Sequence, residues 1–182
     1  LRNNTAYIHA MTEDWEKFLA AARTDKEGKR LNPVRIEGLD STDEKVIGKR
    51  LQEIAKNAAT GGLYTQIGEL YGFPIKVISE RSVSDGLEFI DNRFVVEGNY
   101  KYKYNNGHLA MADTHAAATN FLNALEKIPS IIDQYREKNE VLEREIPQLQ
   151  EIAGKVWKKE EELKGLKSEL AALDRRIQLE LA

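Results

Sequence analysis

The chain has 182 residues, of which 41% are hydrophobic and 31% charged, and its net charge is −3. This balance gives no global attraction to nucleic acid or anionic membranes, so such a contact would need a local patch. The absence of cysteine excludes disulfides, thiolate catalysis and cysteine-containing zinc sites. No apolar run approaches the roughly 20 residues that span a bilayer. Because the chain starts at Leu1 without a signal-like segment, we expect a cytoplasmic piece of a longer protein.

The first part of the chain predicts two helices separated by a strand. Thr12 is expected to cap the first helix, after a short strand or lead-in at residues 5–10. Residues 33–37 alternate as a strand. Ser41-Thr-Asp-Glu44 has the pattern of a capping box and predicts a second helix that ends near Gly61.

Between residues 63 and 105 the hydrophobic period changes to two, which is typical of strands. One hairpin is predicted around Tyr71-Gly72-Phe73 and another around Asp91-Asn92, a pair suited to a turn with positive φ. Consecutive hairpins form an antiparallel meander with one face packed on helices. We therefore predict an α+β domain with an antiparallel sheet over residues 1–113.

From residue 114 onward, after a helix capped by Asp113, apolar residues recur at steps of three and four. Such a stripe needs a partner helix. Gly154 lies midway, so residues 114–182 are predicted to form a long antiparallel helical hairpin, a coiled-coil arm with branches of about 30 Å. Pro129 and Pro147 should each begin a new segment or kink the helix. The predicted interface consists of Ile132, Tyr135, Asn139, Leu142, Leu163, Leu166, Leu170, Leu173 and Ile177.

Two features of the arm have alternative interpretations. Asn139 occupies a position in the ladder of residues at steps of three and four where an apolar side chain is expected. It either sets the register of the coiled coil or marks a solvated gap. The helices pair either within one chain, as Gly154 permits, or between two chains, in which case a continuous helix through Gly154 forms a long dimeric coiled coil.

Tyr100-Lys-Tyr-Lys-Tyr104 is the sharpest local signal, because on a strand the tyrosines share one face and the lysines the other. Tyrosines that face outward would stack nucleobases while the lysines meet phosphate. Tyrosines that face inward are core residues, and we favour this interpretation. The candidate nucleic-acid-binding residues are Arg93, Tyr100, Lys101, Tyr102 and Lys103.

Catalytic and metal-binding patterns are weak. His108, Asp113 and His115 have ligand-type side chains, but no fourth ligand is suggested and Asp113 is needed as a helix cap. No nucleophile elbow or glycine-rich phosphate loop occurs. We predict no catalytic residues, no cofactor and no metal.

Several segments resemble the C-terminal region of large helicase/DNA-methylase proteins (Snf-type) from mobile elements of Bacteroides-like bacteria. They are Gly68-Glu-Leu-Tyr-Gly-Phe73, Asp91-Asn-Arg-Phe94, Tyr102-Lys-Tyr-Asn-Asn-Gly107, Ala117 to Pro129, and Trp157 to Ile177. The resemblance implies an accessory domain whose partners are upstream helicase and methylase domains of the same polypeptide, and DNA.

Three functions follow as hypotheses. The first is a non-catalytic accessory domain that assists DNA engagement or coupling between domains. The second is a structural module for protein–protein interaction, which docks or forms a homodimer through the helical arm without DNA contact. An independent enzyme is a third hypothesis, because a fold does not dictate function.

Overall fold

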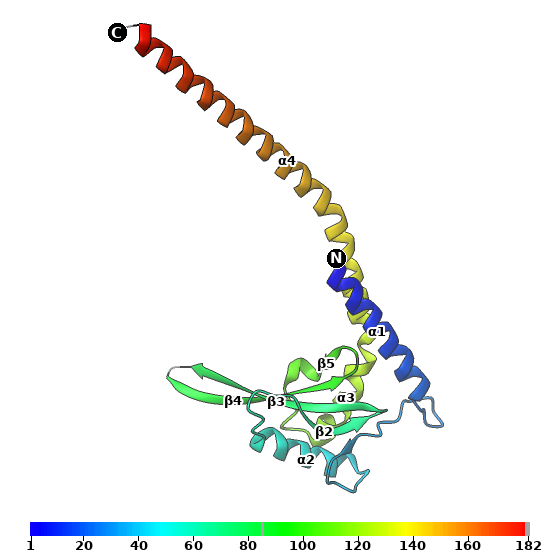
Figure 1. The fold of residues 1–182 in the computed structure, drawn as a ribbon. Coiled ribbons are helices and arrows are strands. Elements are labelled where there is room, and N and C mark those ends of the chain that lie inside the picture. The colour runs from blue at the N-terminus through cyan, green and yellow to red at the C-terminus, as the bar shows by residue number, and fades with distance from the viewer. Residues whose placement is uncertain (85, 181–182) are drawn as a thin grey trace. The chain divides into compact units, whose positions relative to one another are not determined.

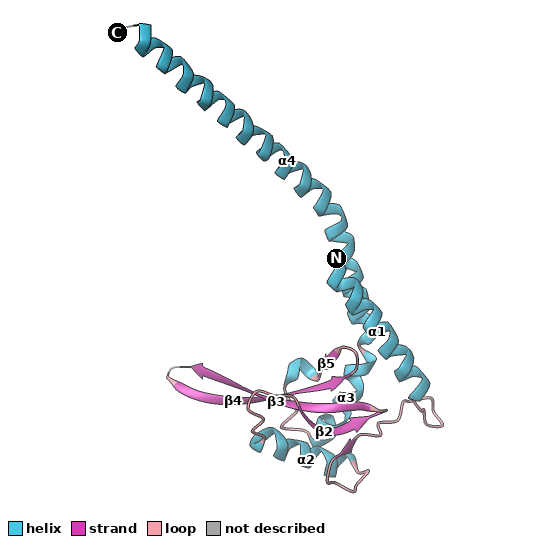
Figure 2. Ribbon diagram, in the orientation of Figure 1, coloured by secondary structure: helices cyan, strands magenta, loops and turns pink. Residues whose placement is uncertain are grey.

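The computed structural model describes residues 1–84 and 86–180, in which one antiparallel sheet packs against helices (Figure 1, Figure 2). The sheet has five strands in the order β1-β2-β3-β4-β5, and every neighbouring pair is antiparallel. The predicted α+β class and the antiparallel meander are therefore confirmed. In chain order the elements are α1 (Arg2–Ala21), β1 (Arg35–Ile36), α2 (Glu44–Asn57), β2 (Thr65–Leu70), β3 (Phe73–Ser84), β4 (Leu87–Glu97), β5 (Lys101–Lys103), α3 (Thr114–Glu126) and α4 (Ile128–Glu180).

The core lies between one face of the sheet and the helices α2 and α3. The register places Val77 opposite Phe94, so their side chains share this face, and both are buried. Phe94 meets Phe121 of α3 with ring centroids 6.3 Å apart. Helix α2 adds Ile47 and Leu51, which are also buried. Since the strands alternate, the other face of the sheet carries charged side chains.

Helix termini depart from the prediction in two places. Helix α1 begins at Arg2, and Thr12 lies inside it with its hydroxyl donating to the carbonyl of Ile8. Prediction of a cap at Thr12 is wrong because a threonine can also bond back four residues within a helix. Asp43, rather than Ser41, caps α2 by accepting from the amides of Lys45 and Val46. The predicted cap of α3 at Asp113 is confirmed.

The second hairpin turns at a different place from the one predicted. Asp91 and Asn92 lie inside β4, and the reversal falls between Ser84 and Leu87, where Gly86 has a φ of +77°. Asn92 is buried and donates to the carbonyl oxygens of Ala55 and Ala58 at the end of α2. The side-chain amide of Asn92 therefore caps the C-terminal end of α2 through a long-range contact and does not form a turn.

Helix α4 runs from Ile128 to Glu180 without interruption. The predicted reversal at Gly154 is wrong, because a helical hairpin needs a break there and the helix passes through it. Pro129 lies in the first turn of α4, as predicted for a proline that begins a segment. Pro147 lies within the helix, where a proline removes one backbone hydrogen bond and costs about 3 kcal/mol.

The chain divides into two compact units after Arg136 rather than after residue 113. Residues Arg2–Arg136 form the globular unit, and the chain from Glu137 onward forms the second. Helix α3 and the start of α4 belong to the globular unit because Phe121, Leu125 and Ile128 are fully buried in its core. The second unit consists of the remaining length of α4.

Across residues 1–84 and 86–180, no helix combines the length and apolarity needed to cross a membrane.

A pair of alanine substitutions tests the packing of α2 on α3. A Cβ atom at Gly48 of α2 would overlap the carbonyl oxygen of Thr114, whereas a Cβ at Gly154 of α4 meets nothing within 4 Å. Gly48→Ala is therefore expected to lower the free energy of unfolding by about 1–3 kcal/mol. Urea unfolding followed by circular dichroism measures this.

The matched control is Gly154→Ala, which removes a poor helix former at an open position and should stabilise α4 by up to about 1 kcal/mol. Equal effects of the two substitutions would contradict the close helix contact.

Candidate interaction surfaces

The tyrosine strand faces inward. Tyr102 and Tyr104 are buried to 1% and 0% exposure, while Tyr100 is partly buried. The Tyr104 hydroxyl donates to the carbonyl oxygen of Ala116 or Ala117 in α3. The interpretation of these tyrosines as core residues is confirmed, and Tyr102 cannot stack a nucleobase because no face of its ring reaches solvent.

A buried carboxylate bonds to the first part of this strand and to the turn before it. Asp14 of α1 is 2% exposed and accepts from the amides of Asn99 and Tyr100, at 2.9 and 3.0 Å. The Tyr102 hydroxyl donates to the same carboxylate at 2.6 Å. Burial is the main cause that raises the pKa of Tyr102, and the hydrogen bond to the Asp14 anion raises it further. The hydrogen bond with Tyr135 is the main cause that raises the pKa of Tyr100 to about 12, and burial adds to it.

Basic residues on the opposite face are engaged in ion pairs. Lys101 pairs with Glu97 at 3.0 Å, and Lys76 pairs with the same carboxylate. The hydrogen bond from Lys76, together with Lys101, lowers the pKa of Glu97 against the opposing effect of burial. Arg93 contacts Glu80 at 2.9 Å and Asp91 at 3.3 Å. The candidate residues Arg93, Lys101 and Lys103 therefore share one face of the sheet, but acidic partners neutralise the first two.

The two histidines considered as metal ligands, His108 and His115, each contact a different acidic side chain. His108 contacts Asp91 at 3.4 Å, and His115 contacts Glu44 at 2.7 Å. Asp113 accepts from the amides of His115 and Ala116 as the cap of α3. In the part of the chain that the structure describes, no three acidic or histidine side chains form a group that would hold a metal ion.

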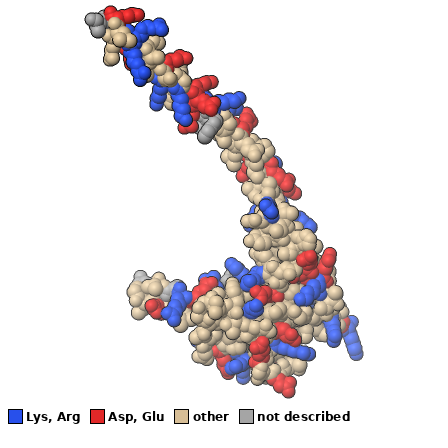
Figure 3. Space-filling view, in the orientation of Figure 1, with Lys and Arg blue, Asp and Glu red and all other residues tan. Residues whose placement is uncertain are grey.

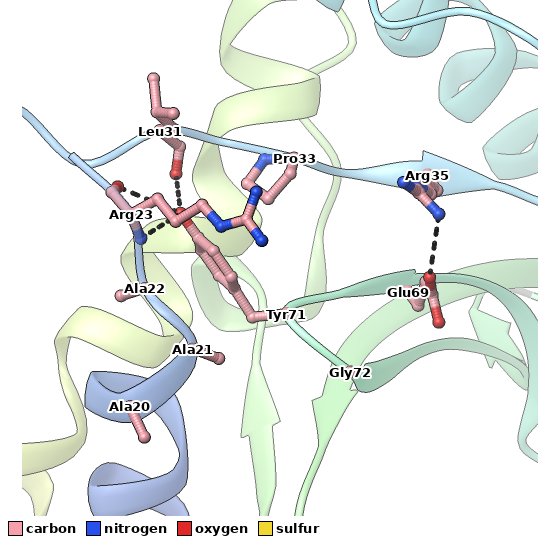
Figure 4. A pocket seen from close by; sticks show the side chains of 10 residues that line it. All are labelled: Ala20, Ala21, Ala22, Arg23, Leu31, Pro33, Arg35, Glu69, Tyr71 and Gly72. Carbon is pink, nitrogen blue, oxygen red and sulfur yellow. Dashed lines mark hydrogen bonds and ion pairs between the residues drawn. The ribbon is translucent and has the colours of Figure 1, made fainter. Parts of the chain in front are cut away.

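A hollow of about 520 Å³ lies beside the end of α1 and is closed by Tyr71 (Figure 4). Tyr71 has a φ of +52°, which is strained for a residue with a side chain. Its hydroxyl donates to the carbonyl of Leu31 at 2.6 Å and accepts from the amide of Arg23 at 3.3 Å. The phenol is therefore used to clamp the loop after α1. The remaining polar groups of the hollow, Arg35 and Glu69 among them, form no pairing of nucleophile and base.

The tip of the β3–β4 hairpin is apolar on both faces and extends beyond its neighbouring strands (Figure 1). Val83 and Ile90 are 70% and 59% exposed, and their register places them on the core-facing side. Leu87 and Phe89, at 63% and 50%, lie on the other side. The acidic residues Glu88 and Asp91 outnumber Arg81 here, so the tip is not suited to bind phosphate.

The apolar ladder of the C-terminal region is used in two different ways. Its first members, Phe121, Leu125, Ile128 and Ile132, are buried in the globular unit, and Tyr135 packs against the same core. Its last members are between 47% and 63% exposed along α4. We call these last residues the distal stripe: Leu163, Leu166, Leu170, Leu173 and Ile177.

The residues in the middle of the ladder are intermediate in solvent exposure. Asn139 and Leu142 are partly buried, and Leu149 is exposed. Lysine, arginine and acidic side chains are interspersed along the visible face of α4 (Figure 3). The nine predicted interface residues therefore do not form one surface. Two of them serve the globular core, and five form an apolar line on an otherwise charged helix.

Sequence reasoning missed the long-range contacts of Asp14 and Asn92, which, like Ser79, are buried polar residues that connect distant segments. A carboxylate on the buried side of a predicted helix is the only local signal for Asp14. Asp85-Gly86, a pair typical of tight hairpin turns, is a stronger turn signal than Asp91-Asn92 and identifies the true position from sequence.

Comparison with protein families matches residues 19–125 to a domain of unknown function, DUF8438. The matched range covers more than half of the chain. The chain belongs to the DUF8438 family. The DUF8438 match extends from the end of α1 to α3 and stops before α4. No curated protein and no solved structure matches the chain.

Removal of one hydroxyl tests the Asp14 contact. Tyr102→Phe should lower the free energy of unfolding by about 1.5–3 kcal/mol at neutral pH, because a buried hydrogen bond to a charged acceptor is lost. Urea unfolding measures the change. Tyr64→Phe, which alters an exposed tyrosine, is the matched control and should change stability by less than about 0.5 kcal/mol.

The same tyrosines predict a loss of stability at alkaline pH. A pKa raised on folding means that the stabilisation is complete below the unfolded value of 10.0 and is lost as the pH rises through the folded value. For Tyr100 this window lies between pH 10 and about 12. Urea unfolding across this range should show a steep decline that Tyr100→Phe makes shallower. An unchanged profile in the variant would contradict the Tyr100–Tyr135 interaction.

Proposed function

We propose that this chain is a non-catalytic assembly module of a cytoplasmic DNA-processing protein, and that it self-associates through the distal stripe of α4. The observation that carries the proposal is the exposure of five apolar residues at helical spacing, between 47% and 63% each. The context of a helicase/DNA-methylase protein comes from the sequence resemblance alone.

Helix α4 is a poor helix in isolation, which supports a need for a partner. It contains Pro147 and two glycines, Gly154 and Gly165, each of which weakens a helix interior. Most helical stability in proteins comes from packing of an apolar face. A second copy of this chain offers a stripe of identical spacing, and exposed leucines on both helices would leave water together.

Direct DNA contact has less support from the geometry. Tyr102 is buried, and both Lys101 and Arg93 carry acidic partners. A DNA surface needs basic side chains in excess, because phosphate contacts supply most of the non-specific affinity. Assembly through α4 is therefore the better-supported function.

The proposal predicts a concentration-dependent dimer. Sedimentation velocity of the full chain should show a shift from monomer to dimer within the micromolar range, which is typical of a short apolar helix interface. The double substitution Leu166→Lys with Leu170→Lys should abolish the shift. Circular dichroism should show the thermal unfolding of the globular unit unchanged, since both leucines are exposed outside it.

Leu179→Lys is the matched control. Leu179 is 79% exposed on the same helix but lies two residues from Ile177, outside the stripe. This variant should dimerise like the parent. A chain that stays monomeric at every concentration would sink the proposal, and so would equal loss of dimer in the control.

A further inference from the structure

The charges that flank the distal stripe are arranged in a self-complementary order. Glu169 and Arg176 each precede a stripe residue, on one flank, and Lys167 and Asp174 each follow one, on the other. In a coiled coil these flanking positions set partner choice and orientation. Among the described residues, none of these four side chains has an ion pair within its own chain.

We propose that two copies of α4 pair antiparallel through the last four residues of the distal stripe, Leu166, Leu170, Leu173 and Ile177, around a twofold axis between Ala171 and Ala172. In this register Leu170 of one copy packs against Leu173 of the second, and Leu166 packs against Ile177. Each layer occurs twice because of the symmetry. This arrangement rests on the self-association proposed above and adds its orientation and register.

The flanking charges select this arrangement over the alternatives. In antiparallel pairing, each flank of one helix lies beside the same flank of the second copy. Glu169 therefore meets Arg176 of the second copy, and Lys167 meets Asp174. All four resulting pairs attract. A parallel, in-register pair instead places Glu162 beside Lys167, which attract, but Glu169 beside Asp174, which repel.

Other antiparallel registers are also less favourable. A shift by one heptad in one direction places Glu169 against Glu169 of the second copy, and a shift in the other direction places Arg176 against Arg176. Like charges at these positions oppose association. The ion pairs thus favour the proposed register over its neighbours, including those that keep a similar set of apolar layers.

Cysteine crosslinking tests the orientation directly, because the chain contains no cysteine of its own. We would prepare the full chain as two single variants, Leu166→Cys and Ile177→Cys, and oxidise each alone and then mixed in equal amounts. Residues of one type lie eleven positions apart in the antiparallel register, about 16 Å along the helix axis. A disulfide needs Cα atoms within about 7 Å.

The expected result is a covalent dimer in the mixture and little or none in either variant alone. A covalent dimer in each variant alone would overturn the antiparallel arrangement in favour of a parallel one, while the proposed function would stand. If the parent chain forms no dimer in sedimentation velocity, both the self-association and the antiparallel orientation are overturned. Failure of the orientation alone can therefore be distinguished from failure of the proposed function.

A charge reversal gives an independent test that leaves the apolar stripe intact. Glu169→Arg should raise the Kd for dimerisation about tenfold, since two attractive pairs become repulsive. Adding Arg176→Glu in the same chain should restore the parent Kd, because the pair is then reversed. Tighter dimerisation by Glu169→Arg alone would overturn the proposal, because only parallel pairing places this residue beside Asp174.

Discussion

The fold of the globular unit depends on the carboxylate of Asp14. This one side chain accepts hydrogen bonds from two backbone amides of the β4–β5 turn and from the Tyr102 hydroxyl, and so fixes α1 to the edge of the sheet. The contact requires a glycine beside it, because a Cβ at Gly98 would overlap the carboxylate. A buried charge is costly unless it is well bonded, and three donors satisfy that condition here. The contact holds Tyr102 in its inward orientation.

A single sequence pattern serves two physical purposes in the C-terminal region. The ladder from Phe121 to Ile132 fills the core of the globular unit, whereas the same spacing from Leu163 to Ile177 remains exposed. The periodicity of hydrophobic residues indicates that a helix has an apolar face, but it does not indicate what covers that face. The start of α4 is therefore buried in the globular core, while its far end carries an exposed apolar line.

Local signals explain what sequence could predict. The alternation of Tyr100 to Tyr104 and the cap at Asp113 depend only on neighbouring residues, and the structure confirms both. Asn92 fails as a turn residue because its partners, Ala55 and Ala58, are distant in the chain. Gly154 permits a reversal but does not require one, and no contact of the described chain forces α4 to bend back there. The ambiguous sites are those whose outcome depends on tertiary contacts.

The Ser79–Asn92 contact divides the β3–β4 ribbon into two regions of unequal local stability. Ser79 donates to Asn92 across the strands at 2.6 Å, and Thr60 joins the same cluster through two further hydrogen bonds. Up to this point helix α2 covers the ribbon, whereas beyond it Val83 and Ile90 are exposed. A two-stranded ribbon without a packed face is marginally stable in water. Backbone amides of residues 80–84 and 86–91, on the tip side of this contact, should therefore exchange with solvent through local opening. Those on the core side should exchange only when the whole core unfolds.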